Sequence, residues 1–366
     1  MNQYVLNTLQ TFLKENNCDL AYIQDPASIR LLTNFSSEPH ERVIALVVTC
    51  ELKTLLFVPA LEHAAAQKAE PMIPVYSYHD HENPWQLLVD AIHTISPAKT
   101  WAVEKEHFSL ARFESVSSVL PHVQFAADLT PFFNQARLIK QEHEIQLLHE
   151  AGALADLAVE IGATALKEGI SEIEVVAEIE YQLKKRGVTS MSFDTMVLFG
   201  DHAADPHGEP GKRRLQKNEW VLFDLGVMHK GYASDTTRMV FFGEKPNTHQ
   251  QEVFDVVKEA HDLAIQAVKP GVTASSIDKI ARDYITAKGY GDYFIHRLGH
   301  GIGQSCHEFP SIMEGNDMLL QEGMCFSVEP GIYIAGDIGI RVEDCLVVTK
   351  DDAEVFTHSP AFRIIG

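Results

Sequence analysis

The stretch Trp220-Val221-Leu222-Phe223-Asp224-Leu225-Gly226 places a carboxylate near the end of an otherwise apolar run. A second acid, Asp235, follows in the polar stretch Ser234-Asp235-Thr236-Thr237-Arg238. A short apolar run of this kind predicts a buried strand. Because an unpaired carboxylate is costly to bury, acids in or beside such strands need a partner. The first stretch therefore predicts a strand whose acid needs a partner, and Asp235 is a candidate for the same site.

Three further segments supply residues of the same kind. They are Leu298-Gly299-His300-Gly301-Ile302-Gly303, Met324-Cys325-Phe326-Ser327-Val328-Glu329-Pro330 and Gly339-Ile340-Arg341-Val342-Glu343-Asp344. Four carboxylates and one imidazole suit two divalent ions such as manganese, cobalt or zinc. Bridging carboxylates can hold two such ions about 3.5 Å apart. The glycines beside His300 allow close backbone approach because they lack a Cβ.

The first third of the chain alternates helix-like and strand-like segments. The opening segment has helical spacing, and strands are expected at residues 20–23, 43–48, 55–58, 101–103 and 123–126. This alternation predicts an α/β domain of modest size.

The pattern changes after Thr130-Pro131. Residues 141–166 predict one long amphipathic helix, and Ser171 with Glu174 predicts a capping box at the start of the next. Strands are expected at 196–199, 220–225 and 238–242. A helix opened by a Thr248/Gln251 capping box, a helix at 277–285, and strands at 324–328, 340–348 and 353–356 follow. Helices followed by strands, twice over, predict an α+β domain with an antiparallel sheet.

Composition narrows the class of protein. The 366 residues are 45% hydrophobic and 22% charged, which is typical of a soluble globular chain long enough for two domains. A net charge of −21 argues against nucleic acid and anionic lipid as partners. Five cysteines without CxxC spacing argue against a disulfide framework or a structural zinc site. With no signal peptide and no apolar run long enough for a membrane, we expect a cytoplasmic protein.

The five stretches, taken together and in this order, resemble the motif set of the pita-bread metallopeptidases, the family of methionine aminopeptidase, aminopeptidase P and prolidase. The resemblance implies a creatinase-type N-terminal α/β domain at residues 1–133 and a pita-bread α+β catalytic domain at residues 134–366. The N-terminal domain and the stretch Leu32-Thr33-Asn34-Phe35-Ser36-Ser37-Glu38-Pro39-His40-Glu41-Arg42 resemble bacterial prolidases most closely.

The resemblance also implies a role for each motif residue. Asp224 chelates one metal, Asp235 and Glu343 bridge two, and His300 and Glu329 complete the shell of the second. A metal-bridging hydroxide then attacks the scissile carbonyl. Glu329 carries the proton to the leaving nitrogen. We expect manganese, with cobalt or zinc as alternatives.

Two further histidines match the family pattern. His207, in Asp205-Pro206-His207-Gly208, and His307, in Cys306-His307-Glu308-Phe309-Pro310, are expected to contact the substrate or the oxyanion. The chain departs from the pattern at His202, where relatives often have asparagine. It departs again at Ser311, where some prolidases have an arginine that binds the substrate carboxylate.

The sequence leaves open which basic residue binds the substrate carboxylate in place of that arginine. Arg297 and Arg341 are the nearest candidates, although Arg341 serves equally well as a support for a ligand carboxylate. Arg42 is a third candidate, because the loop that contains it resembles one that reaches the partner subunit's active site in a homodimer. We expect such a dimer.

The sequence therefore predicts a metal-dependent Xaa-Pro dipeptidase that acts on small peptides. Aminopeptidase P, which acts on longer Xaa-Pro peptides, has the same metal core and is the main alternative. A non-catalytic pita-bread binding module is disfavoured because such modules typically lose metal ligands. A creatinase-type amidinohydrolase is disfavoured because that branch does not retain this metal set.

Overall fold

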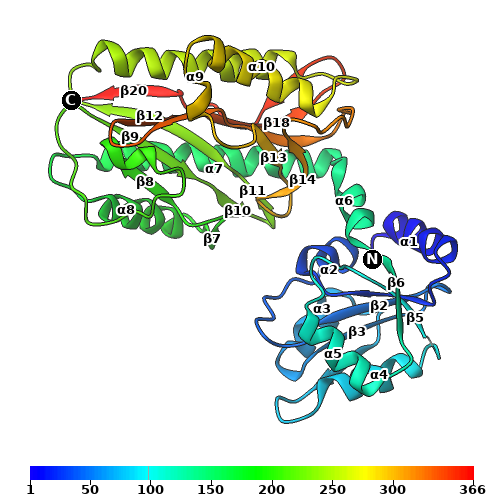
Figure 1. The fold of residues 1–366 in the computed structure, drawn as a ribbon. Helices are drawn as coiled ribbons and strands as arrows, with labels where there is room; N and C mark the ends of the chain where they lie inside the picture. Colours follow the sequence, from blue (N-terminus) through cyan, green and yellow to red (C-terminus); the bar gives the residue numbers. More distant parts are fainter. Residues whose placement is uncertain (98) are drawn as a thin grey trace. The chain divides into compact units, whose positions relative to one another are not determined.

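In the computed structural model, which describes residues 1–97 and 99–366, the chain divides into two compact units, Met1–Ala136 and Arg137–Gly366. Figure 1 shows the elements of both units, coloured from the N-terminus to the C-terminus. The division predicted between residues 133 and 134 falls within helix α6 (Thr130–Leu138), which connects the units in sequence. None of the helices in the described ranges is long and apolar enough to cross a membrane.

The first unit is built on a six-stranded mixed sheet of order β4-β3-β2-β1-β5-β6. In chain order its elements are α1 (Gln3–Glu15), β1 (Leu20–Ile23), α2 (Pro26–Thr33), β2 (Ala45–Thr49), β3 (Thr54–Pro59), η1 (Ala60–Glu62), α3 (His63–Ala69), β4 (Val75–Tyr78), α4 (Pro84–His93), β5 (Thr100–Val103), α5 (Leu110–Val119) and β6 (Gln124–Asp128). The expected α/β character of this region is confirmed.

The central strands of this sheet are apolar on both faces. Successive residues of β1 alternate between two hydrophobic clusters: Ala21 and Ile23 belong to one, Leu20 and Tyr22 to the other. Since successive side chains of a strand point to opposite faces, each face of the sheet has its own core. This explains why the strand-forming runs of the first unit read as continuous hydrophobic stretches.

The second unit contains a nine-stranded sheet whose main path is β14-β13-β15-β18-β12-β9-β8. Its elements after α6 are α7 (Glu142–Ala165), α8 (Glu172–Lys185), β7 (Ser190–Met191), β8 (Met196–Phe199), η2 (Gly200–Ala204), β9 (Glu219–Leu225), β10 (Val227–His229), β11 (Tyr232–Ala233), β12 (Thr236–Phe242), α9 (Thr248–Ala267), α10 (Ala274–Ala287), η3 (Gly291–Tyr293), β13 (Gly299–Gly301), β14 (Glu308–Ile312), β15 (Cys325–Val328), β16 (Gly331–Ile334), β17 (Ile338–Arg341), β18 (Glu343–Val348), β19 (Ala353–Val355) and β20 (Phe362–Ile365). Along the main path neighbouring strands are antiparallel, as predicted, and only β20 adds to β12 in parallel.

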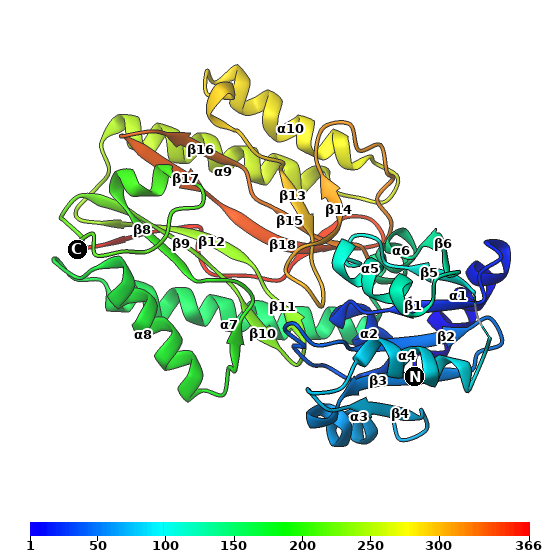
Figure 2. The same ribbon diagram turned by 60° about the horizontal axis from the view of Figure 1, so that its bottom comes forward.

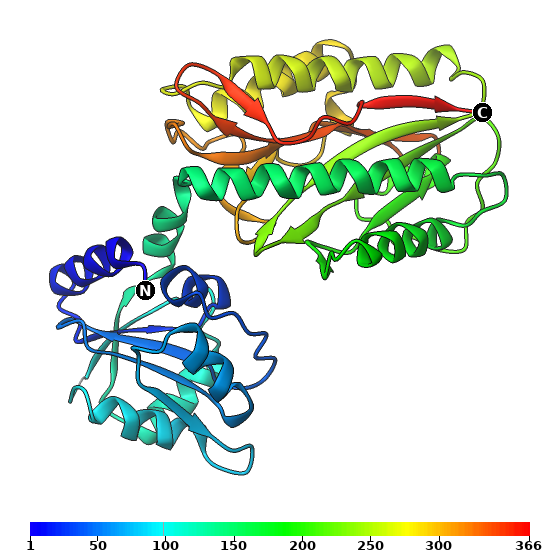
Figure 3. The ribbon, with the colours of Figure 1, turned by 180° about the vertical axis from the view of Figure 1, so that it is seen from behind.

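Helices cover both faces of this sheet. In the second unit, α9 and α10 lie on one side of the strands and α7 and α8 on the other (Figure 1). Residues of β9 alternate accordingly, with Trp220 and Leu222 in the cluster that includes α9 and α10, and Val221 and Phe223 in the cluster that includes α7 and α8. Figure 2 shows the β16–β17 hairpin beside β8 and β9, and Figure 3 shows α7 running along the sheet.

Two expectations about element boundaries need correction. The capping box at the start of α9 is formed by Asn247 and Gln250, not by Thr248 and Gln251. The segment 340–348 is not one strand, because β17 ends at Arg341 and β18 begins at Glu343. By contrast, the Ser171/Glu174 capping box is confirmed, and α7 occupies the predicted 141–166 segment apart from its two cap residues.

Candidate metal centre

The register of three adjacent strands brings two of the acids together. Thr237 on β12 pairs with Asp224 on β9 and, on its other side, with Glu343 on β18. Residues directly opposite one another in a sheet project from the same face. Asp235 lies two residues before Thr237, and residues two apart in an extended segment point to the same face. Three carboxylates from three segments therefore converge on one face of the sheet.

The remaining ligand candidates complete the cluster. His300 lies in β13, and Glu329 directly follows β15. Side-chain donor atoms lie within 4.8 Å of one another in three overlapping groups: Asp224, Asp235 and Glu343; His300, Glu329 and Glu343; and Asp235, His300 and His307. The structure thus brings all five predicted metal-ligand residues, and His307, into one cluster.

Close backbone approach around His300 depends on its glycine neighbours. A Cβ on Gly299 would lie 1.8 Å from the carbonyl oxygen of Ser327, and one on Gly301 would lie 2.4 Å from that of Phe309. No other residue type fits these positions without moving β14 or β15. The glycines therefore allow the His300 ring to reach the carboxylates of the neighbouring strands.

The orientation of the His300 ring leaves a nitrogen facing the acids. Its Nδ1 lies 3.1 Å from the carbonyl oxygen of Gly301, which can only accept, so Nδ1 carries the hydrogen. Its Nε2 lies 3.3 Å from Glu329 Oε1 and 3.6 Å from Asp235 Oδ2. Burial, and then the nearby His307, lowers the pKa of His300 to about 3. A neutral ring with a lone pair aimed at carboxylates is suited to sharing a cation with them.

The acids repel one another in a buried setting. Burial raises the pKa of Asp235 well above its usual range, and the charges of Asp224 and Glu329 raise it further. The pKa of Glu343 is raised well above its usual range by burial and then by Asp235. Burial is also the main cause that raises the pKa of Glu329 to about 7.

Two buried carboxylate oxygens, Asp224 Oδ1 and Glu343 Oε1, have no hydrogen-bond partner within residues 1–97 and 99–366. Buried polar atoms of native proteins nearly always have partners, so these oxygens have capacity for a ligand. Hard carboxylate oxygens together with imidazole nitrogen match the donors preferred by divalent manganese, cobalt or zinc. The residues present therefore fit a divalent metal centre.

A hydrogen-bonded chain behind the cluster orients the acids. Arg341, which is buried, donates from Nη2 to Asp224 Oδ2 and from Nε to Thr237 Oγ1 at 3.0 Å. Thr237 in turn donates to Glu343 Oε2 at 2.8 Å. Arg341 also donates from Nη1 to the Tyr333 hydroxyl at 2.7 Å. Of the two roles considered for Arg341, these contacts favour support of a ligand carboxylate.

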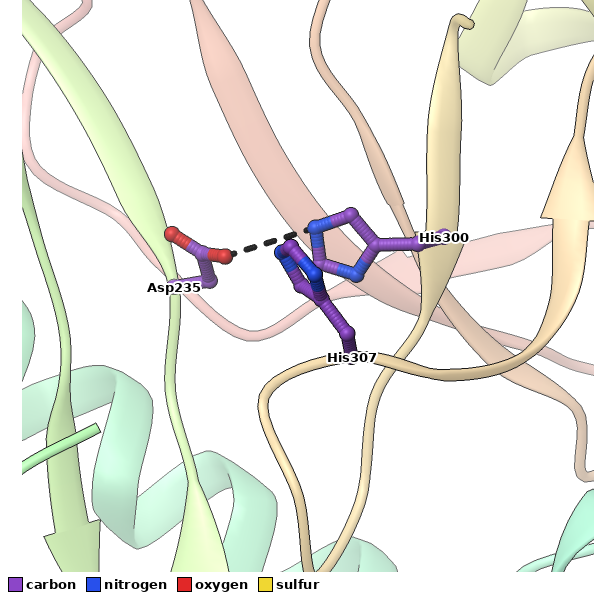
Figure 4. Close-up of side chains that lie close together, drawn as sticks. All are labelled: Asp235, His300 and His307. Atoms are coloured by element: carbon purple, nitrogen blue, oxygen red, sulfur yellow. Dashed lines mark ion pairs between the residues drawn. The ribbon is translucent and has the colours of Figure 1, made fainter. Parts of the chain in front are cut away.

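The two other predicted histidines are exposed. The His307 ring lies beside that of His300, with centroids 3.9 Å apart and planes tilted by 51°, and Figure 4 shows both rings next to Asp235. His207 follows η2, and its backbone N–H donates to Asp205 Oδ1 at 3.2 Å. The charge of His207 is among the causes that lower the pKa of His307, which places the two rings in one electrostatic environment.

The arginine candidates have different surroundings. Arg297 Nη1 donates to Ser311 Oγ at 2.9 Å, and the charge of Arg297 acts on the pKa of both Glu329 and His300. Arg42 belongs to the first unit, where it forms two hydrogen bonds to Asp80, at 2.9 and 3.1 Å. It is not among the residues of the cluster.

Several residues of the site were not singled out from the sequence. Ser327 accepts a bond from the His300 backbone N–H at 3.0 Å and donates to Glu329 Oε1 at 2.9 Å. Cys306 donates to Asp235 Oδ2 at 3.1 Å. His296, whose pKa burial lowers to about 4, lies 3.0 Å from the Tyr333 hydroxyl. Ser327, Cys306 and His296 each lie within two residues of a predicted site residue, and Tyr333 lies four residues after Glu329, so proximity in the sequence was the available signal.

Comparison with known proteins adds the family context. Residues 146–350 match the model of metallopeptidase family M24, and residues 6–139 match that of the creatinase/prolidase N-terminal domain. A Xaa-Pro dipeptidase of Lactobacillus helveticus is 47% identical over 356 residues, which is 97% of this chain and 96% of the relative.

Solved structures extend the likeness over nearly the whole chain. A Xaa-Pro dipeptidase from Bacillus anthracis superposes with a TM-score of 0.90 at 30% identity, covering 99% of both chains. An X-Pro aminopeptidase from Thermotoga maritima gives a TM-score of 0.84, also at 30% identity, over 95% of this chain and 98% of that one. Since both kinds of peptidase share the fold, the fold alone does not decide between them.

Proposed function

The chain belongs to metallopeptidase family M24, and from this premise we propose that it is a metal-dependent Xaa-Pro dipeptidase. The observation that carries the proposal is the cluster of Asp224, Asp235 and Glu343, in which two buried carboxylate oxygens have no hydrogen-bond partner among the described residues. A site of this kind serves hydrolysis through metal ions. Similarity to Xaa-Pro dipeptidases over nearly the full length supports the choice of substrate.

We propose two divalent ions, with manganese as the first choice and cobalt or zinc as alternatives. Asp224 would bind one ion, Asp235 and Glu343 would bind both, and His300 and Glu329 would bind the other. When bound, such ions polarise the substrate carbonyl and lower the pKa of a water molecule. The overlapping donor groups, which share Asp235, Glu343 and His300, support a shared site rather than two separate ones.

Side chains of the protein would transfer the proton to the leaving nitrogen and stabilise the negative charge that develops on the carbonyl oxygen. Ser327 donates to Glu329 Oε1 and so orients the carboxylate, and we propose that Glu329 accepts a proton and passes it to the leaving nitrogen. His207 and His307 are both exposed, and we propose that they donate to the carbonyl oxygen as its negative charge develops.

Recognition of the substrate must use the ring and the carboxylate of proline, because its tertiary amide has no N–H to bind. We propose that Arg297 holds the carboxylate. Its bond to Ser311 leaves further N–H donors on the guanidinium, which has five. A cation at this position would favour dipeptides over longer peptides, in which the carboxylate of proline is part of a peptide bond.

The test compares three substrates on the manganese-loaded protein: a Xaa-Pro dipeptide, its C-terminal amide, and a Xaa-Pro-Xaa tripeptide. A dipeptidase should cleave the free acid with the highest kcat/KM. Ready cleavage of the tripeptide would reassign the protein to aminopeptidase P activity. No cleavage of any of the three would remove the peptidase proposal.

We further propose a homodimer in which the loop that contains Arg42 approaches the partner's active site. This loop resembles a prolidase loop, and Arg42 is only partly buried within its own unit. Light scattering at working concentrations should give twice the mass of the 40.9 kDa chain. A fully active monomer would contradict this assembly.

The proposed compartment is the cytoplasm, where the five free thiols would stay reduced.

A further inference from the structure

The loop of residues 200–211 connects β8 to the turn before β9 and contains His207. Its first residues form η2, where Asp205 N–H donates to the carbonyl of His202 at 3.1 Å. Gly208 N–H then donates to the carbonyl of Asp205 at 3.1 Å. These bonds are all local. The placement of His207 therefore depends on what holds the loop as a whole.

Glu172 holds this loop at both ends. Its carboxylate, which has no solvent exposure, accepts the N–H of Phe199 at Oε1 and the N–H of Gly211 at Oε2, both at 2.9 Å. Phe199 is the last residue before the loop, and Gly211 is the last residue in it. One carboxylate thus fixes the distance between the two ends.

His202 supplies the third bond to the same carboxylate, from within the loop. Its Nδ1 lies 2.8 Å from Glu172 Oε1. An ionised carboxylate only accepts, so Nδ1 carries the hydrogen and donates. On the other side of the ring, Nε2 would lie 3.3 Å from a Cβ placed on Gly208. The His202 ring therefore packs against the backbone of the residue that follows His207.

We propose that Glu172 and His202 form a clamp, named here the loop clamp, that positions the loop segment containing His207. A buried carboxylate with three donors is well satisfied, and its location in the first turn of α8 is favourable for a negative charge. The clamp thus connects a rigid helix to an exposed active-site side chain. This inference rests on the proposed function, which gives His207 its role at the substrate.

An asparagine at residue 202 would also offer the clamp an N–H donor from its side-chain amide. The donor, rather than the imidazole as such, is what the clamp needs. His202→Asn should therefore retain the clamp, whereas His202→Leu, of similar size, should lose it.

The first test measures hydrogen exchange of residues 200–211 and kinetics on a Xaa-Pro dipeptide. His202→Leu should speed exchange of the loop and lower kcat by about 10- to 100-fold, as expected for a misplaced catalytic group, with metal content unchanged. His202→Asn should restore most of the activity. The matched control is His229→Leu, which removes another His–Glu pair of 2.8 Å in the same unit and should leave exchange of this loop and kcat unchanged.

The second test is a double-mutant cycle. If the loop clamp acts through His207, His202→Leu should cost little more once His207→Ala has been made. Equal and additive losses would overturn the proposal, as would unchanged loop exchange in His202→Leu. Glu172→Gln, which keeps size but replaces one accepting oxygen by a donor, should reproduce the effect. Loop exchange does not require a substrate, so failure of the clamp and failure of the dipeptidase proposal are distinguishable.

Discussion

Both units bury a glutamate, but the two carboxylates have different surroundings. In the first unit, Glu104 Oε2 accepts the backbone N–H groups of Gln24 and Asp25 at 2.9 and 3.0 Å. In the second unit, Glu343 Oε2 accepts one bond from Thr237, whereas its Oε1 has no partner and other acids lie nearby. Burial raises the pKa of both side chains. The difference teaches that unsatisfied acceptors in a group of acids, rather than burial alone, distinguish a ligand site from a structural carboxylate.

The largest effect should come from removing one charge from the group of acids. Asp235→Asn keeps the shape of the side chain but loses a charge that we propose to be shared by two ions. We expect turnover to fall by more than about 100-fold, beyond the usual cost of losing a residue that only supports a ligand. Steady-state kinetics and metal analysis of the purified variant are the measurements.

The control for this variant is Asp80→Asn, which removes an acid of the first unit that pairs with Arg42. It should keep its metal. If Asp235→Asn retained two metals and full activity, the assignment of Asp235 as a shared ligand would be wrong, and the contrast with Glu104 would lose its functional meaning.

Removal of metal should be the next largest effect, because it leaves the acids without a compensating charge. A folded pKa of about 7 for Glu329, above its ordinary value of 4.5, means that the fold prefers the neutral carboxyl. Its contribution to stability is present below about pH 4.5 and is lost as the pH rises toward 7. One pKa unit corresponds to about 1.4 kcal/mol, so this group alone can account for a few kcal/mol.

We therefore expect chelation to lower the melting temperature more at pH 8 than at pH 5. Calorimetry of the metal-loaded and chelated protein at both values measures this difference, and the loaded protein controls for the effect of pH on the rest of the chain. An equal drop at both values would show that the acids do not need the metal charge.

Sequence motifs gave the ligand candidates but not the network that orients them. Asp224 and Glu343 could be found because each stands in a characteristic stretch. Their meeting depends on register, since both pair with Thr237, and register comes from the folded sheet. Tyr333 and its bond to Arg341 were missed for the same reason.

Local boundaries show a second limit. Asn247/Gln250 and Thr248/Gln251 offer the same chemistry one residue apart, so periodicity could not choose between them. Gly299-His300-Gly301 has little tendency to form a strand, yet it does so between β14 and β15. Tertiary packing decides both cases.

A smaller effect is expected in the first unit. Glu104→Gln weakens charge-assisted bonds to two backbone N–H groups, and such bonds contribute about 1.5–3 kcal/mol each. We expect denaturant unfolding, followed through the buried Trp101 of this unit, to shift to lower concentration while metal content stays the same. Loss of metal from this variant would contradict the separation between structural and ligand carboxylates.

A matched variant in the second unit, Glu343→Gln, should show the opposite pattern, with loss of metal as its main effect.

The smallest effect tests whether the second unit binds the substrate carboxylate through Arg297. Arg297→Ala should raise KM for a Xaa-Pro dipeptide by about 10-fold, which corresponds to about 1.4 kcal/mol, and leave the metals bound. Ser311→Ala frees the guanidinium from its bond of 2.9 Å but keeps its charge, so its KM should change much less.

The C-terminal amide of the same dipeptide lacks the charge that Arg297 would pair with. If Arg297 recognises that charge, its removal should matter for the acid and hardly for the amide, whereas a structural arginine would cost both substrates equally. Equal losses would therefore assign Arg297 to the fold of the site and move the search for the carboxylate partner to Arg42 of the proposed partner subunit.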